Sequence, residues 1–293
     1  MRKNSLLIIA FFLILNLPLT AQNKLAYQIF SANGDMLNYD QMKNDLQKSE
    51  IVFFGELHNN PIAHWLQLSL TEDLYKTTGR DLVLGAEMFE ADNQLIMDEY
   101  LQGDIREKDF ENEARLWNNY STDYKPLVTF AKENQLDFIA TNVPRRYAAK
   151  VSKAGFTALE DLSDKAKLYF APLPVKYDST LACYKDMLQM MHMPGMRGKI
   201  NHNLPKAQAL KDATMAYFIL ENYAAGQLFL HFNGSYHSDN HEGIVWYVKE
   251  KMPEAKVKTI SVVLQNDLSR LEDSNLNVAD YIIVVPDNMT TTY

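Results

Sequence analysis

The chain has 293 residues, of which 47% are hydrophobic, and a formal net charge of -8. An acidic chain lacks the basic surface of nucleic-acid-binding proteins, so we expect no nucleic-acid partner. The length suits one large domain with a sizeable core. The single cysteine, Cys183, excludes an internal disulfide and is expected to be a buried thiol.

Residues 1–21 have the pattern of a secretory signal peptide. Arg2 and Lys3 precede an apolar stretch over residues 6–17, and Ala21 ends the segment. The stretch is shorter than the roughly 20 residues of a membrane span. Cleavage would leave one domain, residues 22–293, with a charge of about -10 once Arg2 and Lys3 are removed. We expect an exported protein, periplasmic or associated with the cell surface. The segment has no cysteine at the cleavage point, so we expect no lipid anchor.

Strand-like and helix-like segments alternate along the rest of the chain. A hairpin is expected over residues 25–39, with Asn33-Gly34 at its turn. Helices are expected over residues 39–49, 61–79, 92–101, 124–135, 207–226 and 242–251, and strands over 51–56, 82–87, 136–144, 227–234, 257–264 and 280–286. This alternation predicts an α/β fold with a mostly parallel sheet. Residues 150–205 lack a strand pattern and predict an inserted helical subdomain.

Polar residues follow the strands, at the sheet edge where parallel α/β proteins bind ligands. Two apolar runs end in Gly-x-x-His, at His58 and at His237, and a third run reaches Glu87. Imidazole and carboxylate are common ligands of divalent metals, so these residues predict a metal site. The alternative is that each histidine is merely hydrogen-bonded near a strand end. His64, six residues after His58, is a candidate third imidazole, although it also suits a helix surface.

Other polar residues at these strand ends have candidate catalytic roles. Glu56 or Glu90 would act as general base for a metal-bound water, and Arg145 would steady negative charge. Glu56 and Glu87 would alternatively cap helices or pair with Arg145. His231, inside a strand, is expected to be a hydrogen-bonded core histidine.

Residues 187–196 are rich in methionine and surround His192. Flexible thioethers pack well against a porphyrin, and histidine or methionine can ligate haem iron. We therefore take His192, Met191 and Met193 as candidate haem ligands, with copper(I) as a second chemical option. The alternative is an apolar helical stripe that ends at Pro194-Gly195. One of the 16 tyrosines is a further candidate iron ligand.

Five segments together resemble the ChaN family, in the same order along the chain: GELHNNPIAH (55–64), GAEMFEADNQ (85–94), ATNVPRR (140–146), AQALKDATMA (207–216) and NGSYH (233–237). The resemblance covers nearly the whole mature chain. It implies an iron-regulated haem-binding uptake protein with a three-layer α/β/α core, a helical insert and haem held at a dimer interface. Outer-membrane uptake machinery is the implied partner. The chain departs from the family in lacking the lipoprotein cysteine, and in having Asn233-Gly234-Ser235-Tyr236 before the second histidine where a glycine-rich turn is frequent.

The same resemblance extends to the wider superfamily, which includes TIKI and TraB proteins and resembles erythromycin esterases. TIKI relatives are metal-dependent proteases, and their metal ligands would correspond here to His58, Glu87 and His237. Two functions therefore follow: an exported homodimeric haem-binding protein, or a metal-dependent hydrolase. A third class, an exported structural protein, would bind neither haem nor metal.

Overall fold

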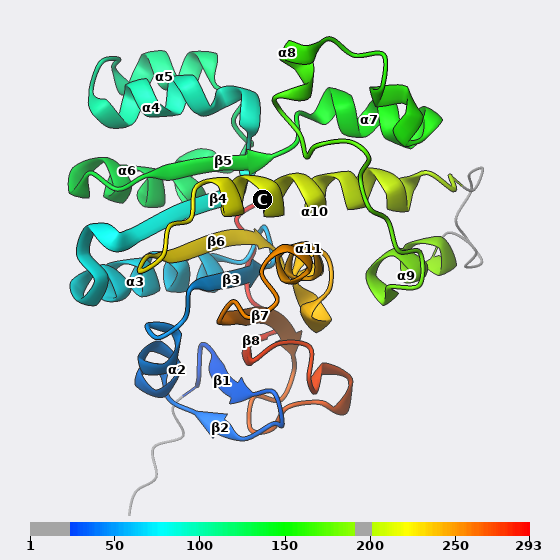
Figure 1. Cartoon of the computed structure of the whole chain (residues 1–293). Coiled ribbons are helices and arrows are strands. Elements are labelled where there is room, and N and C mark those ends of the chain that lie inside the picture. The colour runs from blue at the N-terminus through cyan, green and yellow to red at the C-terminus, as the bar shows by residue number, and fades with distance from the viewer. Residues whose placement is uncertain (1–23, 191–200) are drawn as a thin grey trace, which may run out of the picture.

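A computed structural model describes residues 24–190 and 201–293. Their strands form one eight-stranded sheet in the order β2-β1-β8-β7-β3-β6-β4-β5 (Figure 1). The strands are β1 (Gln28–Ser31), β2 (Met36–Leu37), β3 (Ile51–Glu56), β4 (Leu82–Glu90), β5 (Phe138–Asn142), β6 (Leu228–Gly234), β7 (Val257–Gln265) and β8 (Tyr281–Pro286). The neighbouring strands among β3 to β8 are parallel, and only β1 and β2 are antiparallel additions at one edge. The predicted mostly parallel sheet is confirmed, as is the hairpin, whose turn contains Gly34 at a φ of +87°.

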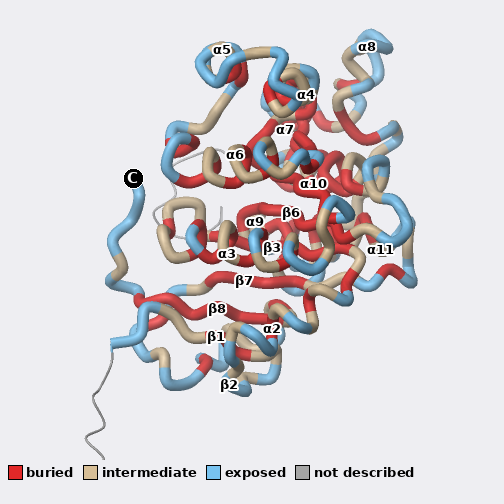
Figure 2. Tube along the Cα trace, turned by 90° about the vertical axis from the view of Figure 1, so that its left-hand side faces the viewer, coloured by how far each residue is buried: buried red, intermediate tan, exposed pale blue. Residues whose placement is uncertain are grey.

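Helices cover both faces of the sheet, so the predicted three-layer α/β/α core is also confirmed (Figures 1 and 2). One face packs against α2 (Tyr39–Leu46), α3 (Pro61–Thr78), α4 (Gln94–Gln102) and α6 (Lys125–Asn134). The other face packs against α10 (Leu204–Glu221) and α11 (Ile244–Lys251). Because both faces are covered, every residue of β3, β5, β6 and β8 is buried, which explains their continuous apolar sequences.

The start of α3 is determined by local sequence. The side chain of Asn60 accepts hydrogen bonds from the backbone N–H groups of Ile62 and Ala63, each at 3.0 Å. Pro61 occupies the first turn, where its missing N–H removes no helical bond. Because of this cap, α3 begins three residues after His58. The short loop between β3 and α3 therefore stays at the edge of the sheet.

The described part of residues 150–205 contains helices and no strand. It includes the end of α7 (Arg145–Ala154), α8 (Asp164–Lys167) and α9 (Ala182–Met190). Val151, Leu159 and Phe170 pack with Leu210 of α10 in a separate hydrophobic cluster. Cys183 is buried in α9, as expected. The predicted signal peptide and the candidate haem ligands Met191, His192 and Met193 lie outside the described residues.

Two helices were not anticipated from the sequence. The helix α5 (Glu107–Glu113) is short and polar and buries only Phe110, so it has no apolar periodicity. The helix α7 begins directly after Pro144, so its first half precedes the predicted helical insert. Across the described ranges, no helix combines the length and hydropathy that a membrane span requires.

Candidate functional site

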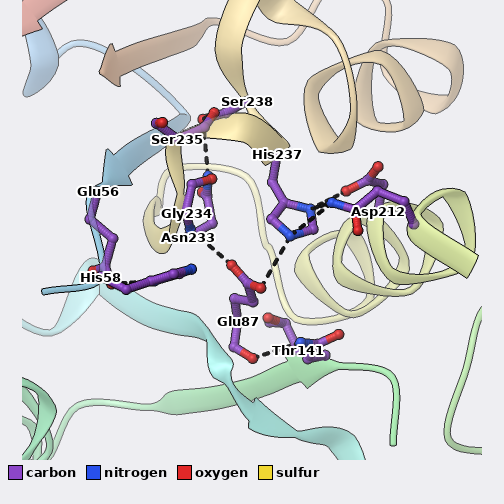
Figure 3. Close-up of polar contacts among 12 residues, drawn as sticks. Glu56, His58, Glu87, Thr141, Asp212, Asn233, Gly234, Ser235, His237 and Ser238 are labelled. Atoms are coloured by element: carbon purple, nitrogen blue, oxygen red, sulfur yellow. Dashed lines mark hydrogen bonds and ion pairs between the residues drawn. The ribbon is translucent and has the colours of Figure 1, made fainter. Parts of the chain in front are cut away.

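The polar residues that follow β3, β4 and β6 converge at the carboxyl edge of the sheet (Figure 3). Glu56 is the last residue of β3, and His58 follows it. Glu87 lies in β4 where the register with β5 shifts between Ala86 and Glu90. His237 closes the short turn Ser235–His237 after β6. The predicted convergence of His58, Glu87 and His237 is therefore seen in the structure.

His237 lies between two buried carboxylates. Its Nε2 is 3.1 Å from Oε1 of Glu87, and its Nδ1 hydrogen-bonds Oδ1 of Asp212 on α10 (Figure 3). Tyr184 of α9 donates a hydrogen bond to the other oxygen of Asp212, at 2.7 Å. The side chains of His237, Glu87 and Asp212 are each at most 6% exposed. The cluster joins β4, the turn after β6 and α10 through charged hydrogen bonds.

The two carboxylates keep His237 protonated. Burial alone would lower the pKa of the imidazole, but Glu87 and Asp212 raise the pKa to about 10. Burial alone would raise the pKa of Glu87, yet His237 and, more weakly, His58 hold that pKa well below its usual range. The site therefore contains an imidazolium flanked by carboxylates at neutral pH.

This arrangement predicts a pH-dependent contribution of His237 to stability. Because the folded-state pKa is raised above 6.5, the contribution is fully present below about pH 6.5 and is lost as the pH rises through about 10. The difference in unfolding free energy between the wild type and His237→Gln should therefore shrink from pH 6 to pH 10. Urea unfolding at both pH values measures it, and a constant difference would contradict the assigned charge state.

Gly234 leaves open the space between His58 and Glu87. Its backbone N–H donates a hydrogen bond of 2.8 Å to Oε2 of Glu87. A Cβ atom at this position would approach Nε2 of His58 to 2.8 Å and Oε2 of Glu87 to 3.5 Å. Only glycine leaves this space free, and the imidazole and the carboxylate border it from two sides (Figure 3).

Glu56 orients the ring of His58. Nδ1 of His58 donates to Oε1 of Glu56 at 2.9 Å. Glu56 is fully buried and also accepts hydrogen bonds from Tyr124, at 2.7 Å, and from Gln67. Burial works to lower the pKa of His58, but Glu56 and Glu87 together raise it above its ordinary value. Glu56 thus holds the ring of His58 in place.

His64 and His231 do not join this group. The ring nitrogens of His64 lie 3.0 Å from Oε1 of Gln67 and 3.0 Å from the carbonyl oxygen of His58. His231 is fully buried, and its nitrogens contact Thr141 at 2.8 Å and Asn233 at 3.1 Å. Burial lowers the pKa of His231 to about 4, so it is a neutral core residue.

Two hollows adjoin the site. The first, here the inner cavity, has a volume of about 450 Å³ and lies between α7 and α10 above the strand ends, lined among others by His58, Glu87, Asn142, Arg145, Gln208, Lys211 and His237. The second, here the outer cleft, has a volume of about 740 Å³ and is lined among others by Arg115, Leu116, Trp117, Arg145, Arg146 and Tyr293. Glu90, Trp117, Arg145 and Ala149 line both hollows.

The cations of the outer cleft differ in their partners. Arg115 pairs with Glu90 at 2.9 Å and with Asp92, and Arg146 pairs with Asp92 at 2.6 Å. Arg145 forms no ion pair with any residue in the described ranges. Of the two alternatives for Arg145, an internal salt bridge and a ligand contact, the geometry leaves its guanidinium available for a ligand.

Several residues of the site were not identified from the sequence. Asp212, Tyr124 and Trp117 lie on helices or turns far from the strand ends in the chain, and no short-range pattern marks them. Asp212 does lie within the segment 207–216 that carries part of the family resemblance, which was the available signal.

The described residues do not show the predicted metal site. His58 and Glu87 border the space above Gly234, but both nitrogens of His237 already contact carboxylates. Within residues 24–190 and 201–293, no group of three His, Cys, Asp or Glu side chains is arranged to hold a metal ion.

Comparison with known proteins identifies the family. The family model described as haem-binding uptake, Tiki superfamily, ChaN matches residues 42–248. A structure described as cofacial heme binding to ChaN of Campylobacter jejuni aligns with a TM-score of 0.68 and 16% identity, and covers 88% of this chain and 96% of that chain. The effector domain RRSP of a Vibrio vulnificus MARTX toxin aligns with a TM-score of 0.46 and 15% identity, over 86% of this chain and 43% of that chain. No curated protein sequence matches significantly.

These comparisons confirm the resemblance seen in the sequence. The structural likeness shows a shared fold, and the family model spans well over half of the chain. The chain belongs to the ChaN family of haem-binding uptake proteins, within the Tiki superfamily.

Proposed function

We propose that this protein is exported, binds haem in the outer cleft and acts in haem uptake, with a second copy of the chain covering the bound haem. Family membership supports haem as the ligand. The pattern of residues 1–21 supports export. The observation that carries the proposal is the outer cleft, which combines apolar walls with arginines.

The outer cleft suits haem in size and chemistry. Its volume of about 740 Å³ lies within the usual range for cofactor sites, about 300–1,000 Å³. Trp117, Leu116 and Ala149 provide apolar surface for a porphyrin face. Arg145 and Arg146 would bind the haem propionates by charge-assisted hydrogen bonds.

Tyr293 is a candidate iron ligand in this cleft. Among the described tyrosines, it is the one that lines the outer cleft, and a tyrosine oxygen can bind ferric haem. His192, Met191 and Met193 stay candidate ligands. Bound haem would supply an iron centre, and the protein residues would hold it and screen it from water.

A second copy would shield the open side of the haem. The Campylobacter jejuni relative is described as binding heme cofacially, and a homodimer of this chain would place two clefts face to face. Outer-membrane uptake machinery stays the proposed partner for delivery.

Haemin titration of the purified mature protein tests the proposal. We expect saturable binding with a shifted Soret band, and an increase in mass to that of a dimer in sedimentation experiments. The Tyr293→Phe variant should shift the band again if Tyr293 binds iron. Binding no tighter than that of an unrelated acidic protein would refute haem binding.

A metal-dependent hydrolase is the second candidate function. The observation that favours it is the space above Gly234, bordered by Nε2 of His58 and by Glu87. In this function Glu90 would act as the general base and Arg145 would bind a developing anion, since both line the inner cavity. Glu56 stays a candidate for moving the proton, although its carboxylate is fully buried and accepts a hydrogen bond from Nδ1 of His58.

Metal binding distinguishes the two candidates. Cobalt, manganese or zinc should bind the wild type in calorimetry and bind His58→Ala at least about tenfold more weakly, because one ligand is lost. A panel of amide, ester and phosphoester substrates with each metal should then show hydrolysis. Equal metal binding by both proteins, or no hydrolysis of any substrate, would count against the hydrolase.

A further inference from the structure

We propose that the inner cavity is a second binding site, for a small carboxylate that also carries an N–H or O–H donor. This site adjoins the outer cleft and shares Arg145 with it, but Asn142 and Lys211 line the inner cavity and not the outer cleft. Three features of the described residues support the proposal: the shape of the cavity, two cations that form no ion pair, and a buried acceptor that has no donor.

The cavity exists because small side chains line facing helices. Ala148, Ala149 and Ser152 form the wall on α7, and Ala207 forms part of the wall on α10. These side chains keep the helices from filling the space above the strand ends, and about 450 Å³ is left open. This volume is adequate for a small organic molecule.

The charges in the cavity favour an anion. Arg145 and Lys211 both line it, and neither forms an ion pair with a described residue. Glu87 pairs with His237, which Asp212 shares, and Glu90 pairs with Arg115, which Asp92 shares. A ligand carboxylate can pair with these two cations, and it matches the planar guanidinium of Arg145.

The side chain of Asn142 adds a requirement for a hydrogen-bond donor. Its Nδ2 donates to the carbonyl oxygen of Glu87 at 2.9 Å, which fixes the orientation of the amide. Its Oδ1 is buried and accepts no hydrogen bond from any described residue. A buried acceptor without a donor is unfavourable, so a ligand N–H or O–H would be selected here.

The inner cavity and the outer cleft have separate residues that allow each to be tested alone. Asn142, Gln208 and Lys211 line only the inner cavity, whereas Arg115, Arg146 and Tyr293 line only the outer cleft. Lys206, on the same helix as Lys211, lines neither hollow and provides a matched control.

Calorimetric titration with N-acetylglycine tests the ligand class. This probe has a carboxylate and one N–H, levulinate replaces that N–H by a methylene, and the methyl ester of N-acetylglycine removes the charge. We expect saturable binding of N-acetylglycine, and at least about tenfold weaker binding of each analogue, because each leaves one cavity group unpaired. No saturable binding, or equal binding of N-acetylglycine and levulinate, would overturn the proposal.

Variants locate the site. Lys211→Met should weaken N-acetylglycine binding about tenfold, whereas Lys206→Met should change it by less than about twofold. Equal effects of the two variants would overturn the placement. Haemin titration of the same preparations separates the two proposals, since loss of haem binding alone refutes the proposed function and leaves the inner cavity assignment standing.

Discussion

Replacing His237 with alanine should lower the free energy of unfolding by about 3–5 kcal/mol, as expected when one partner of a buried ion pair is removed. The substitution leaves the carboxylates of Glu87 and Asp212 buried without their shared cation. Both carboxylates would have to take up protons or draw water into the core. Urea unfolding of the variant at pH 7 measures the loss.

His241→Ala is the matched control for this experiment. His241 also pairs with a carboxylate, that of Asp280, at 3.0 Å, but its side chain is 45% exposed. Exposed pairs contribute at most about 1 kcal/mol. Equal losses in the two variants would show that the His237 cluster is not a buried ionic network.

Replacing Glu56 with alanine should lower the free energy of unfolding by about 3 kcal/mol or more. Tyr124, Gln67 and His58 all donate hydrogen bonds to this carboxylate. Each donor left buried without an acceptor costs about 1–3 kcal/mol. Chemical unfolding provides the measurement, and the pKa of His58, followed by NMR, should fall because Glu56 helps to raise it.

Tyr124→Phe separates the carboxylate from one of its donors. The variant removes a single hydrogen bond to Glu56 and keeps the aromatic ring, so we expect a loss of about 1 kcal/mol. If Glu56→Ala were no more destabilising than Tyr124→Phe, Glu56 would not be the centre of this network.

The alternation of strands and helices could be predicted because the core strands are continuous apolar runs. β3 and β8 are buried on both faces, and such runs are short and bounded by polar residues. The helix α5 could not be predicted, since a polar helix that buries only Phe110 has no apolar stripe.

The site was predictable only where it lies at strand ends. His58, Glu87 and His237 follow parallel strands, and the shared direction of those strands brings them together. Asp212 and Tyr124 reach the same residues from helices, through contacts that depend on the packing of the whole chain. The enclosure of Glu56 could not be predicted for a related reason, because the sequence indicates that it ends a strand but not that Tyr124 and Gln67 surround it.

Haem binding in the outer cleft is tested by comparing the haemin affinity of the double variant Arg145→Gln, Arg146→Gln with that of Arg80→Gln, Arg270→Gln. Both double variants remove two arginine charges, but only the first pair lines the outer cleft. We expect at least about tenfold weaker haemin binding for the cleft variant and an affinity within about twofold of the wild type for the control. Equal affinities in both variants would contradict haem binding in the outer cleft.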